Sequence, residues 1–99
     1  MTMPYFITLG NWTDQGIRNA KDVPKRVAAA KKAVQKAGGK WHGLYFTFGK
    51  YDFIVLAEFP DDQAAYSFLV STGSLGNVRT TTLKAFPEAE GFKIIDKLR

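Results

Sequence analysis

Apolar residues run almost unbroken through residues 41–59, and this stretch reads as a β-hairpin. Its strands are expected at about Lys40 to Phe48 and Phe53 to Phe59, joined by the loop Gly49-Lys50-Tyr51-Asp52. A strand with one face in water alternates apolar and polar residues, whereas a strand covered on both faces does not. This hairpin is apolar on both faces, so each face needs cover.

The rest of the chain is predicted to add two strands and three helices, the strands at Tyr5–Asn11 and Asn77–Phe86. The long helices are expected at Val23–Ala37 and from the cap Asp61 to Gly73, and an extra C-terminal helix at Glu88–Leu98. Strand, helix, strand, strand, helix, strand is the ferredoxin-like α+β order. It predicts one four-stranded antiparallel sheet, ordered fourth, first, third, second, with both long helices on one face. We expect a single domain over residues 1–99.

The hairpin register decides which residues meet the helices. If Phe48 pairs with Phe53, the helix face holds His42, Leu44, Phe46, Phe48, Phe53, Val55, Ala57 and Phe59. The other face holds Trp41, Tyr45, Thr47, Ile54, Leu56 and Glu58. That face is too apolar to remain in water. We expect a homodimer, sheet against sheet, about a two-fold axis, as a dimeric α/β barrel, with a higher oligomer left open.

Composition narrows the class of protein. The chain has 99 residues, no cysteine and a net charge of +5. It therefore has no disulfide and no thiolate nucleophile. An apolar stripe on the first long helix leaves Lys21, Lys25, Lys32 and Lys36 on the opposite side, without interleaved aromatic residues. This favours a solvated helix face over a nucleic-acid surface.

The expected location and partners of the protein rest on sequence features that are not found. The sequence shows no secretion signal and no apolar run long enough for a bilayer. We expect a cytoplasmic protein with no nucleic-acid partner and no membrane partner. One histidine and no cysteine predict no metal site, and no cofactor is expected.

The topology brings three polar and aromatic clusters to one end of the sheet. They are Asn11-Trp12-Thr13, the hairpin loop Gly49–Asp52, and Asn77-Val78-Arg79-Thr80. Convergence of this kind is typical of a binding site. The expected ligand contacts are Trp12, Thr13, Tyr45, Thr47, Tyr51, Asp52, Arg79 and Thr80.

Each candidate also has a structural interpretation. Tyr51 and Asp52 can transfer protons, or they can simply close the turn. Arg79 can clamp a carboxylate, or it can pair with Asp14 or Asp52. Glu58, buried in a dimer, is a candidate general acid or base, whereas His42 is expected to be structural, on the helix face. Threonines at positions 8, 80 and 82 are expected to line the barrel between the sheets with Tyr45 and Thr47, or merely to favour strands.

The same clusters carry a family resemblance. The loop Gly49-Lys50-Tyr51-Asp52 contains a Gly-Tyr-Asp signature with one residue inserted, and the stretches Asn11–Gly16 and Gly76–Leu83 fit the same family. From Tyr5 to Phe86 the chain resembles the GYD-domain family. The resemblance implies membership of the dimeric α/β barrel group, which includes small monooxygenases, isomerases and ligand-sensing modules. It leaves the activity open.

The leading hypothesis is a homodimer that binds a small, partly apolar ligand between its sheet and the loops at the hairpin end. The first alternative is a cofactor-independent monooxygenase or isomerase that uses Tyr51, Asp52 or Glu58. The second is a purely structural or interaction module whose sheet face is consumed by the dimer.

Overall fold

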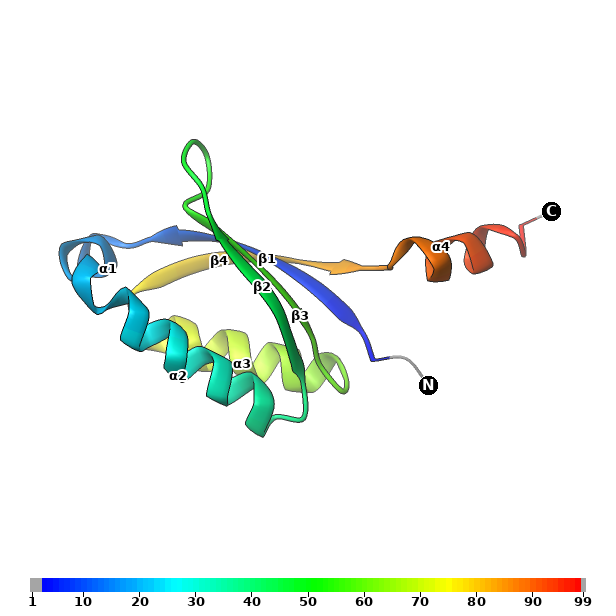
Figure 1. The fold of residues 1–99 in the computed structure, drawn as a ribbon, viewed down its shortest axis with the longest axis horizontal. Coiled ribbons are helices and arrows are strands. Elements are labelled where there is room, and N and C mark those ends of the chain that lie inside the picture. Colours follow the sequence, from blue (N-terminus) through cyan, green and yellow to red (C-terminus); the bar gives the residue numbers. More distant parts are fainter. Residues whose placement is uncertain (1–2, 99) are drawn as a thin grey trace.

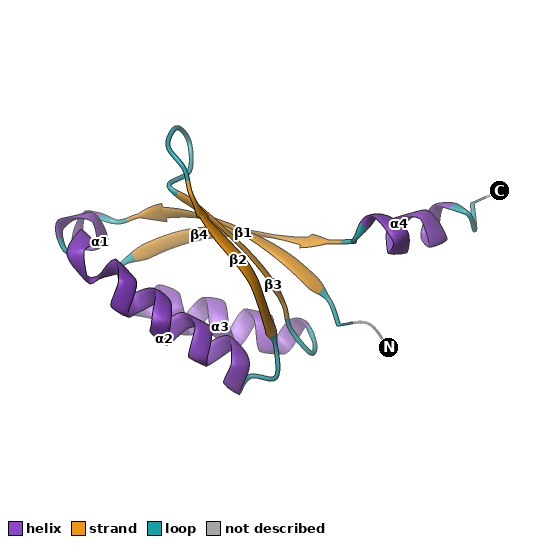
Figure 2. Ribbon diagram, in the orientation of Figure 1, coloured by secondary structure: helices purple, strands orange, loops and turns teal. Residues whose placement is uncertain are grey.

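The computed structural model describes residues 3–98. Figures 1 and 2 show one twisted sheet with two long helices beneath it and a helix that extends beyond one end. The elements are β1 (Tyr5–Trp12), α1 (Asp14–Arg18), the 3₁₀ turn η1 (Ala20–Asp22), α2 (Val23–Lys36), β2 (Lys40–Phe46), β3 (Phe53–Glu58), α3 (Asp62–Ser74), β4 (Val78–Ala85) and α4 (Glu88–Ile95).

The sheet has four antiparallel strands in the order β2-β3-β1-β4. The predicted ferredoxin-like α+β fold and strand order are confirmed. Helices α2 and α3 lie on the same face of the sheet, as right-handed crossovers require. The opposite face carries no helix in Figure 1, and we call it the open face. No helix within residues 3–98 has the length and apolarity needed to cross a membrane.

Side-chain caps fix the starts of two helices. The Thr13 hydroxyl accepts a hydrogen bond from the Gly16 amide at 3.0 Å, which begins α1. The Asp61 carboxylate accepts one from the Ala64 amide at 2.8 Å, which begins α3. Each cap satisfies an amide that has no partner inside its helix. The Asp61 cap was predicted from the sequence.

The predicted pairing of Phe48 with Phe53 is wrong, because Phe46 lies opposite Phe53 and the register of β2 is shifted by two residues. The faces of individual residues also differ from the prediction at both ends of β2. A bulge between Trp41 and Gly43 places Trp41 opposite Ala57, on the helix face. His42 consequently turns to the open face. These two residues were predicted on the reverse faces, and that prediction is wrong because a bulge adds one residue and inverts the alternation.

At the other end, β2 stops at Phe46 rather than Phe48. The Thr47 amide donates to the Asp52 carbonyl at 2.9 Å, and the Thr47 hydroxyl donates to the Tyr51 carbonyl at 2.6 Å. These bonds close the loop two residues early. Phe48 therefore stands in the loop with 99% of its surface exposed, and its predicted place under the helices is wrong.

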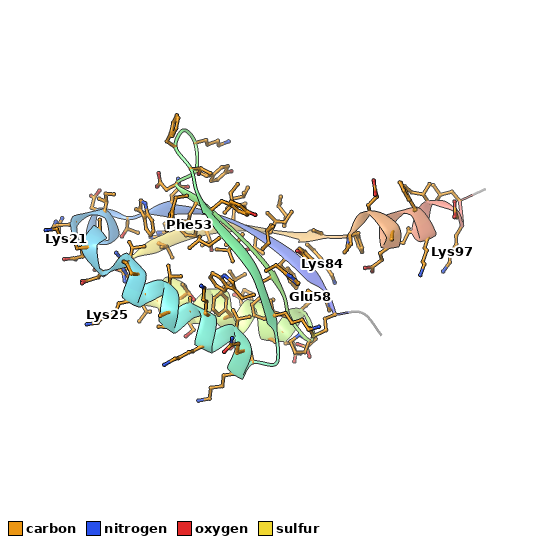
Figure 3. All side chains as sticks on the ribbon, in the orientation of Figure 1. Lys21, Lys25, Phe53, Glu58, Lys84 and Lys97 are labelled. Atoms are coloured by element: carbon orange, nitrogen blue, oxygen red, sulfur yellow. The ribbon has the colours of Figure 1, made fainter. Side chains whose placement is uncertain are left out.

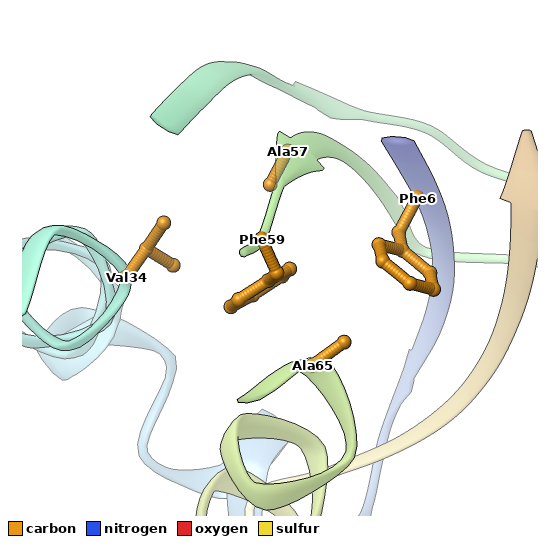
Figure 4. Close-up of a cluster of buried hydrophobic side chains, with 5 residues drawn as sticks. All are labelled: Phe6, Val34, Ala57, Phe59 and Ala65. Carbon is orange, nitrogen blue, oxygen red and sulfur yellow. The ribbon is translucent and has the colours of Figure 1, made fainter. Parts of the chain in front are cut away.

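Figure 4 shows a cluster of buried side chains, which lies toward the end of the sheet away from the hairpin loop. It consists of Phe6, Val34, Ala57, Phe59 and Ala65, from both layers. The rings of Phe6 and Phe59 meet edge to face at 5.9 Å. This packing holds the helices against one end of the sheet.

Candidate functional site

The first two of the three predicted clusters meet through hydrogen bonds. The Trp12 amide donates to Asp52 Oδ2 at 2.9 Å, and the Asp52 amide donates to the Gly10 carbonyl at 2.8 Å. The Asn11 side chain donates to the Lys50 carbonyl at 2.8 Å. The Asp52 carboxylate thus fastens the hairpin loop to the end of β1.

The third cluster is joined to β1 in the same way. The Thr13 hydroxyl donates to the Gly76 carbonyl at 2.6 Å, and the Thr13 amide donates to the Asn77 carbonyl at 3.1 Å. Gly16 approaches so closely that a Cβ atom there would lie 2.0 Å from the Asn77 carbonyl oxygen. The three clusters do lie together, as predicted. The hydrogen bonds among them hold the loops to the end of β1.

Several predicted contact residues face away from the helices or belong to the loop. Tyr45 and Arg79 lie on the open face of the sheet and are exposed. Among residues 3–98, Arg79 forms no ion pair with Asp14 or Asp52. Thr47 is exposed in the hairpin loop, where Lys50 lies over the Tyr51 ring with 5.8 Å from Nζ to the ring centroid.

Glu58 lies on the open face, near the end of the hairpin that is remote from Phe53 (Figure 3). Its Oε2 is 2.5 Å from His42 Nε2, and the His42 ring stacks on Tyr5 with 5.0 Å between centroids. The bulge in β2 turns His42 to the open face, where it meets Glu58. The sequence interpretation did not include this pair. Glu58 and Asp52 belong to opposite ends of β3, as predicted.

A partly open cavity of about 350 Å³ lies between the helices and the sheet. Of the eight predicted ligand contacts, Trp12 and Thr80 line it, and the other six do not. Its walls combine the helix face of the sheet with the facing sides of α2 and α3: Thr8, Trp12, Val23, Arg26, Val27, Ala29, Ala30, Ala33, Trp41, Leu44, Phe46, Phe53, Phe68, Leu69, Ser71, Thr72, Leu75, Asn77, Val78 and Thr80.

Thr8 on β1 and Thr80 and Thr82 on β4 lie on the helix side of the sheet. Thr8 pairs with Thr82, and their hydroxyl oxygens are 3.1 Å apart. Thr8 alternates with Phe6, whose ring is in the core beneath the helices, so Thr8 points toward the same side. The predicted sharing of one face by Thr8, Thr80, Thr82, Tyr45 and Thr47 is wrong, because Tyr45 lies on the open face and Thr47 lies beyond the end of β2.

Aromatic rings form the wall of the cavity near the hairpin end. The Trp12 ring lies 4.9 Å from Phe53 and 6.5 Å from Phe46, between centroids. Phe53 lies directly across Gly10, where an added Cβ would be 2.0 Å from the ring. The absence of a side chain at Gly10 is what allows the far end of this buried ring to lie over β1.

Arg26 is the charged residue of the cavity wall, and the sequence interpretation missed it. Its Nη2 donates to the carbonyls of Gly16 and Asn19 at 3.1 and 2.9 Å, and its Cζ lies 5.6 Å from the centroid of the Trp12 ring. The spacing contained a signal. Arg26 is three residues after Val23 and four before Ala30, which places it beside the apolar stripe of α2 and away from the lysines.

Comparison with known proteins confirms the family resemblance. The model of the GYD domain matches residues 6–95. A curated relative from Thermus thermophilus, named glutamine synthetase and cystathionine beta-lyase binding protein, is 30% identical over 89 residues. That alignment covers 89% of this chain and 94% of the relative.

Solved structures also share this fold. The crystal structure of MtbAldR matches with a TM-score of 0.66 at 16% sequence identity, over 86% of this chain and 52% of that chain. This chain therefore spans about half the length of MtbAldR. At this identity the likeness concerns the fold alone.

Proposed function

The chain belongs to the GYD domain family, and on that premise we propose that it is a homodimer that binds a small, mainly apolar molecule between its sheet and its helices. The observation that carries the proposal is the cavity of about 350 Å³ beside Trp12 and Phe53. Binding sites for small molecules are commonly hollows of roughly 300–1,000 Å³ with mostly apolar walls and a few polar groups. The cavity is at the small end of that range.

Part of this space exists because several residues of α2 that face it are small. Ala29, Ala30 and Ala33 of α2 contribute only methyl groups to the wall. Apolar walls that face empty space lack the close contacts that stabilise a packed core. A bound apolar molecule would supply those contacts.

Binding is favoured over catalysis because the described residues of the wall include no acid, histidine or tyrosine. The hydroxyl and amide groups of Thr8, Thr80 and Asn77 can orient a ligand by hydrogen bonds. The monooxygenase or isomerase hypothesis requires a group that exchanges a proton with the substrate. Asp52, which was a candidate for that role, is engaged with the Trp12 amide.

The direct test is a titration with 1-octanol, a small apolar probe, followed by calorimetry and by NMR shifts of the Trp12 indole. We expect saturable binding to the wild-type protein. Ala30→Leu should weaken it at least tenfold, because the larger side chain fills the cavity. Ala28→Leu is the matched control, since Ala28 is exposed on the same helix and is outside the cavity wall. Equal binding by both variants, or no binding to the wild type, would refute the proposal.

The homodimer is the second part of the proposal. The open face presents Ile7, Leu9, Ile54, Leu56 and Leu83 on adjacent strands. An apolar surface of this extent is characteristic of an interface. A second copy related by a two-fold axis would cover each open face with the same surface.

A second candidate function is the binding of other proteins. The Thermus relative is named for binding glutamine synthetase and cystathionine β-lyase. Phe48, fully exposed in the hairpin loop, is the kind of aromatic anchor that dominates protein interfaces. We expect Phe48→Ser to weaken binding to the host's glutamine synthetase in surface plasmon resonance, while Tyr66→Ser, at an exposed tyrosine on α3, leaves it unchanged. If neither enzyme of the host binds the wild type, this candidate is wrong.

A further inference from the structure

Arg26 places a positive charge on the wall of an otherwise neutral cavity. Of the described residues that line the cavity, Arg26 is the one with an ionisable side chain. A guanidinium stays protonated in proteins, so its charge is permanent. The cavity therefore has a fixed electrostatic sign.

Contacts on one side hold the guanidinium in place. Nη2 donates to the carbonyls of Gly16 and Asn19, and the ring of Trp12 lies alongside the guanidinium. In contrast, Nε and Nη1 are buried and have no hydrogen-bond partner within residues 3–98. A buried donor without an acceptor costs free energy, and more so when it is charged.

No carboxylate among the described residues neutralises this charge. Asp22 lines a neighbouring hollow together with Arg26, yet the two form no ion pair. Arg26 also lies in the first turn of α2, a turn that contains no acidic residue. The N-terminal end of a helix is the positive end of its dipole, so the helix adds to the positive potential at Arg26. An arginine at this end of a helix is unfavourable, because the positive end of the dipole favours acidic side chains.

We propose that the natural ligand is a small amphipathic anion, a carboxylate with an apolar body. This inference rests on the proposed function and names the class of its ligand. The apolar body would lie against the aromatic wall of Trp12, Phe46 and Phe53, and the carboxylate would lie toward Arg26. A carboxylate supplies the negative charge that no described residue provides to this guanidinium in an ion pair.

The experiment compares three probes that share one tail: octanoate, 1-octanol and octylamine. In calorimetric titrations of the wild-type protein at low salt, we expect octanoate to bind roughly tenfold or more tightly than octanol, because hydrogen bonds to charged groups are strong. Octylamine should bind more weakly than octanol. Ala30→Leu should weaken the binding of both octanoate and octanol.

Variants then assign the preference to Arg26. Arg26→Met removes the charge and keeps a long side chain, and it should abolish the preference for octanoate while octanol still binds. Lys25→Met is the matched control, because it removes an exposed charge from the adjacent position and lies outside this cavity wall. It should keep the preference for octanoate.

The outcomes separate the two proposals. If octanol and octanoate bind the wild type equally, or if Arg26→Met keeps the preference, the inference about the anion is wrong and the ligand-binding function stands. If neither probe binds the wild type, the ligand-binding function itself is wrong. The wild-type comparison decides the question even if Arg26→Met does not fold.

Discussion

Two glycines with opposite surroundings test the packing beside the cavity. A Cβ at Gly10 would lie 2.0 Å from the ring of Phe53, whereas a Cβ at Gly73 in α3 would meet nothing within 4 Å. Gly10→Ala should therefore lower the free energy of unfolding by about 1–3 kcal/mol through overpacking. Gly73→Ala should raise it by up to about 1 kcal/mol, because alanine favours the helix. Urea denaturation of both variants measures the difference, and a harmless Gly10→Ala would contradict the position of the Phe53 ring.

The Asp52 carboxylate offers a second test at the scale of one residue. Its Oδ2 accepts the Trp12 amide proton, so Asp52→Ala should cost about 1–2 kcal/mol of stability. Asp52→Asn keeps a side-chain oxygen that can accept the same hydrogen bond, and it should cost less than half as much. Chemical denaturation at neutral pH distinguishes the two. Equal losses would mean that the charge of Asp52, rather than its hydrogen bond, stabilises the loop.

At the scale of elements, sequence patterns correctly predicted the features that depend only on residues close together in the sequence. The cap Asp61 and the approximate ends of the long helices are local features, and they were found correctly. The bulge in β2 was missed, because the alternation was carried unbroken through Gly43. A glycine inside a strand pattern is itself a sign of a bulge, so this signal was available.

The cavity could not be predicted from such local patterns. Its volume depends on the distance between α2 and the sheet, and such a distance depends on packing between residues far apart in the sequence, such as Val34 and Phe59. Alanines in the stripe of α2 look the same in a sequence whether they permit close packing or leave a hollow. The convergence of the three clusters could be predicted, since topology alone fixes it, but the side of the sheet with room for a ligand could not.

The C-terminal helix gives a prediction at the element scale. Phe92, Ile95 and Leu98 are all more than half exposed, and α4 extends away from the sheet in Figure 1. An amphipathic helix is normally stabilised by burial of its apolar side. We expect α4 to pack on the second copy of the proposed dimer.

Ending the chain after Pro87 tests this expectation. The shortened protein should keep its far-ultraviolet circular dichroism apart from the helical signal of α4, because the core lies outside α4. Its dimer dissociation constant should rise at least tenfold, as measured by sedimentation equilibrium. An unchanged dissociation constant would show that α4 plays no part in the dimer.

At the scale of the whole molecule, these proposals assign ligand binding to one face of the sheet and dimer formation to the other. The helix face encloses the cavity, and the open face is left for a second copy. The residues of the two faces alternate along the same strands, as Thr8 does with Ile7 and Leu9. A ligand and a partner chain can therefore contact the same strands from opposite sides, and substitutions that abolish one should spare the other.

Ile7 is the position that tests this separation, because it lies between Leu56 and Leu83 in the middle of the open face. Ile7→Lys would bury a charge in the apolar dimer interface, and it should give a folded monomer. Sedimentation velocity at micromolar concentration should show a dimer for the wild type and for the control Tyr66→Lys, which alters an exposed tyrosine on α3. The monomer should still bind 1-octanol, since the cavity lies on the other face. A monomeric wild type would refute the dimer, and loss of octanol binding in folded Ile7→Lys would show that the two faces are not independent.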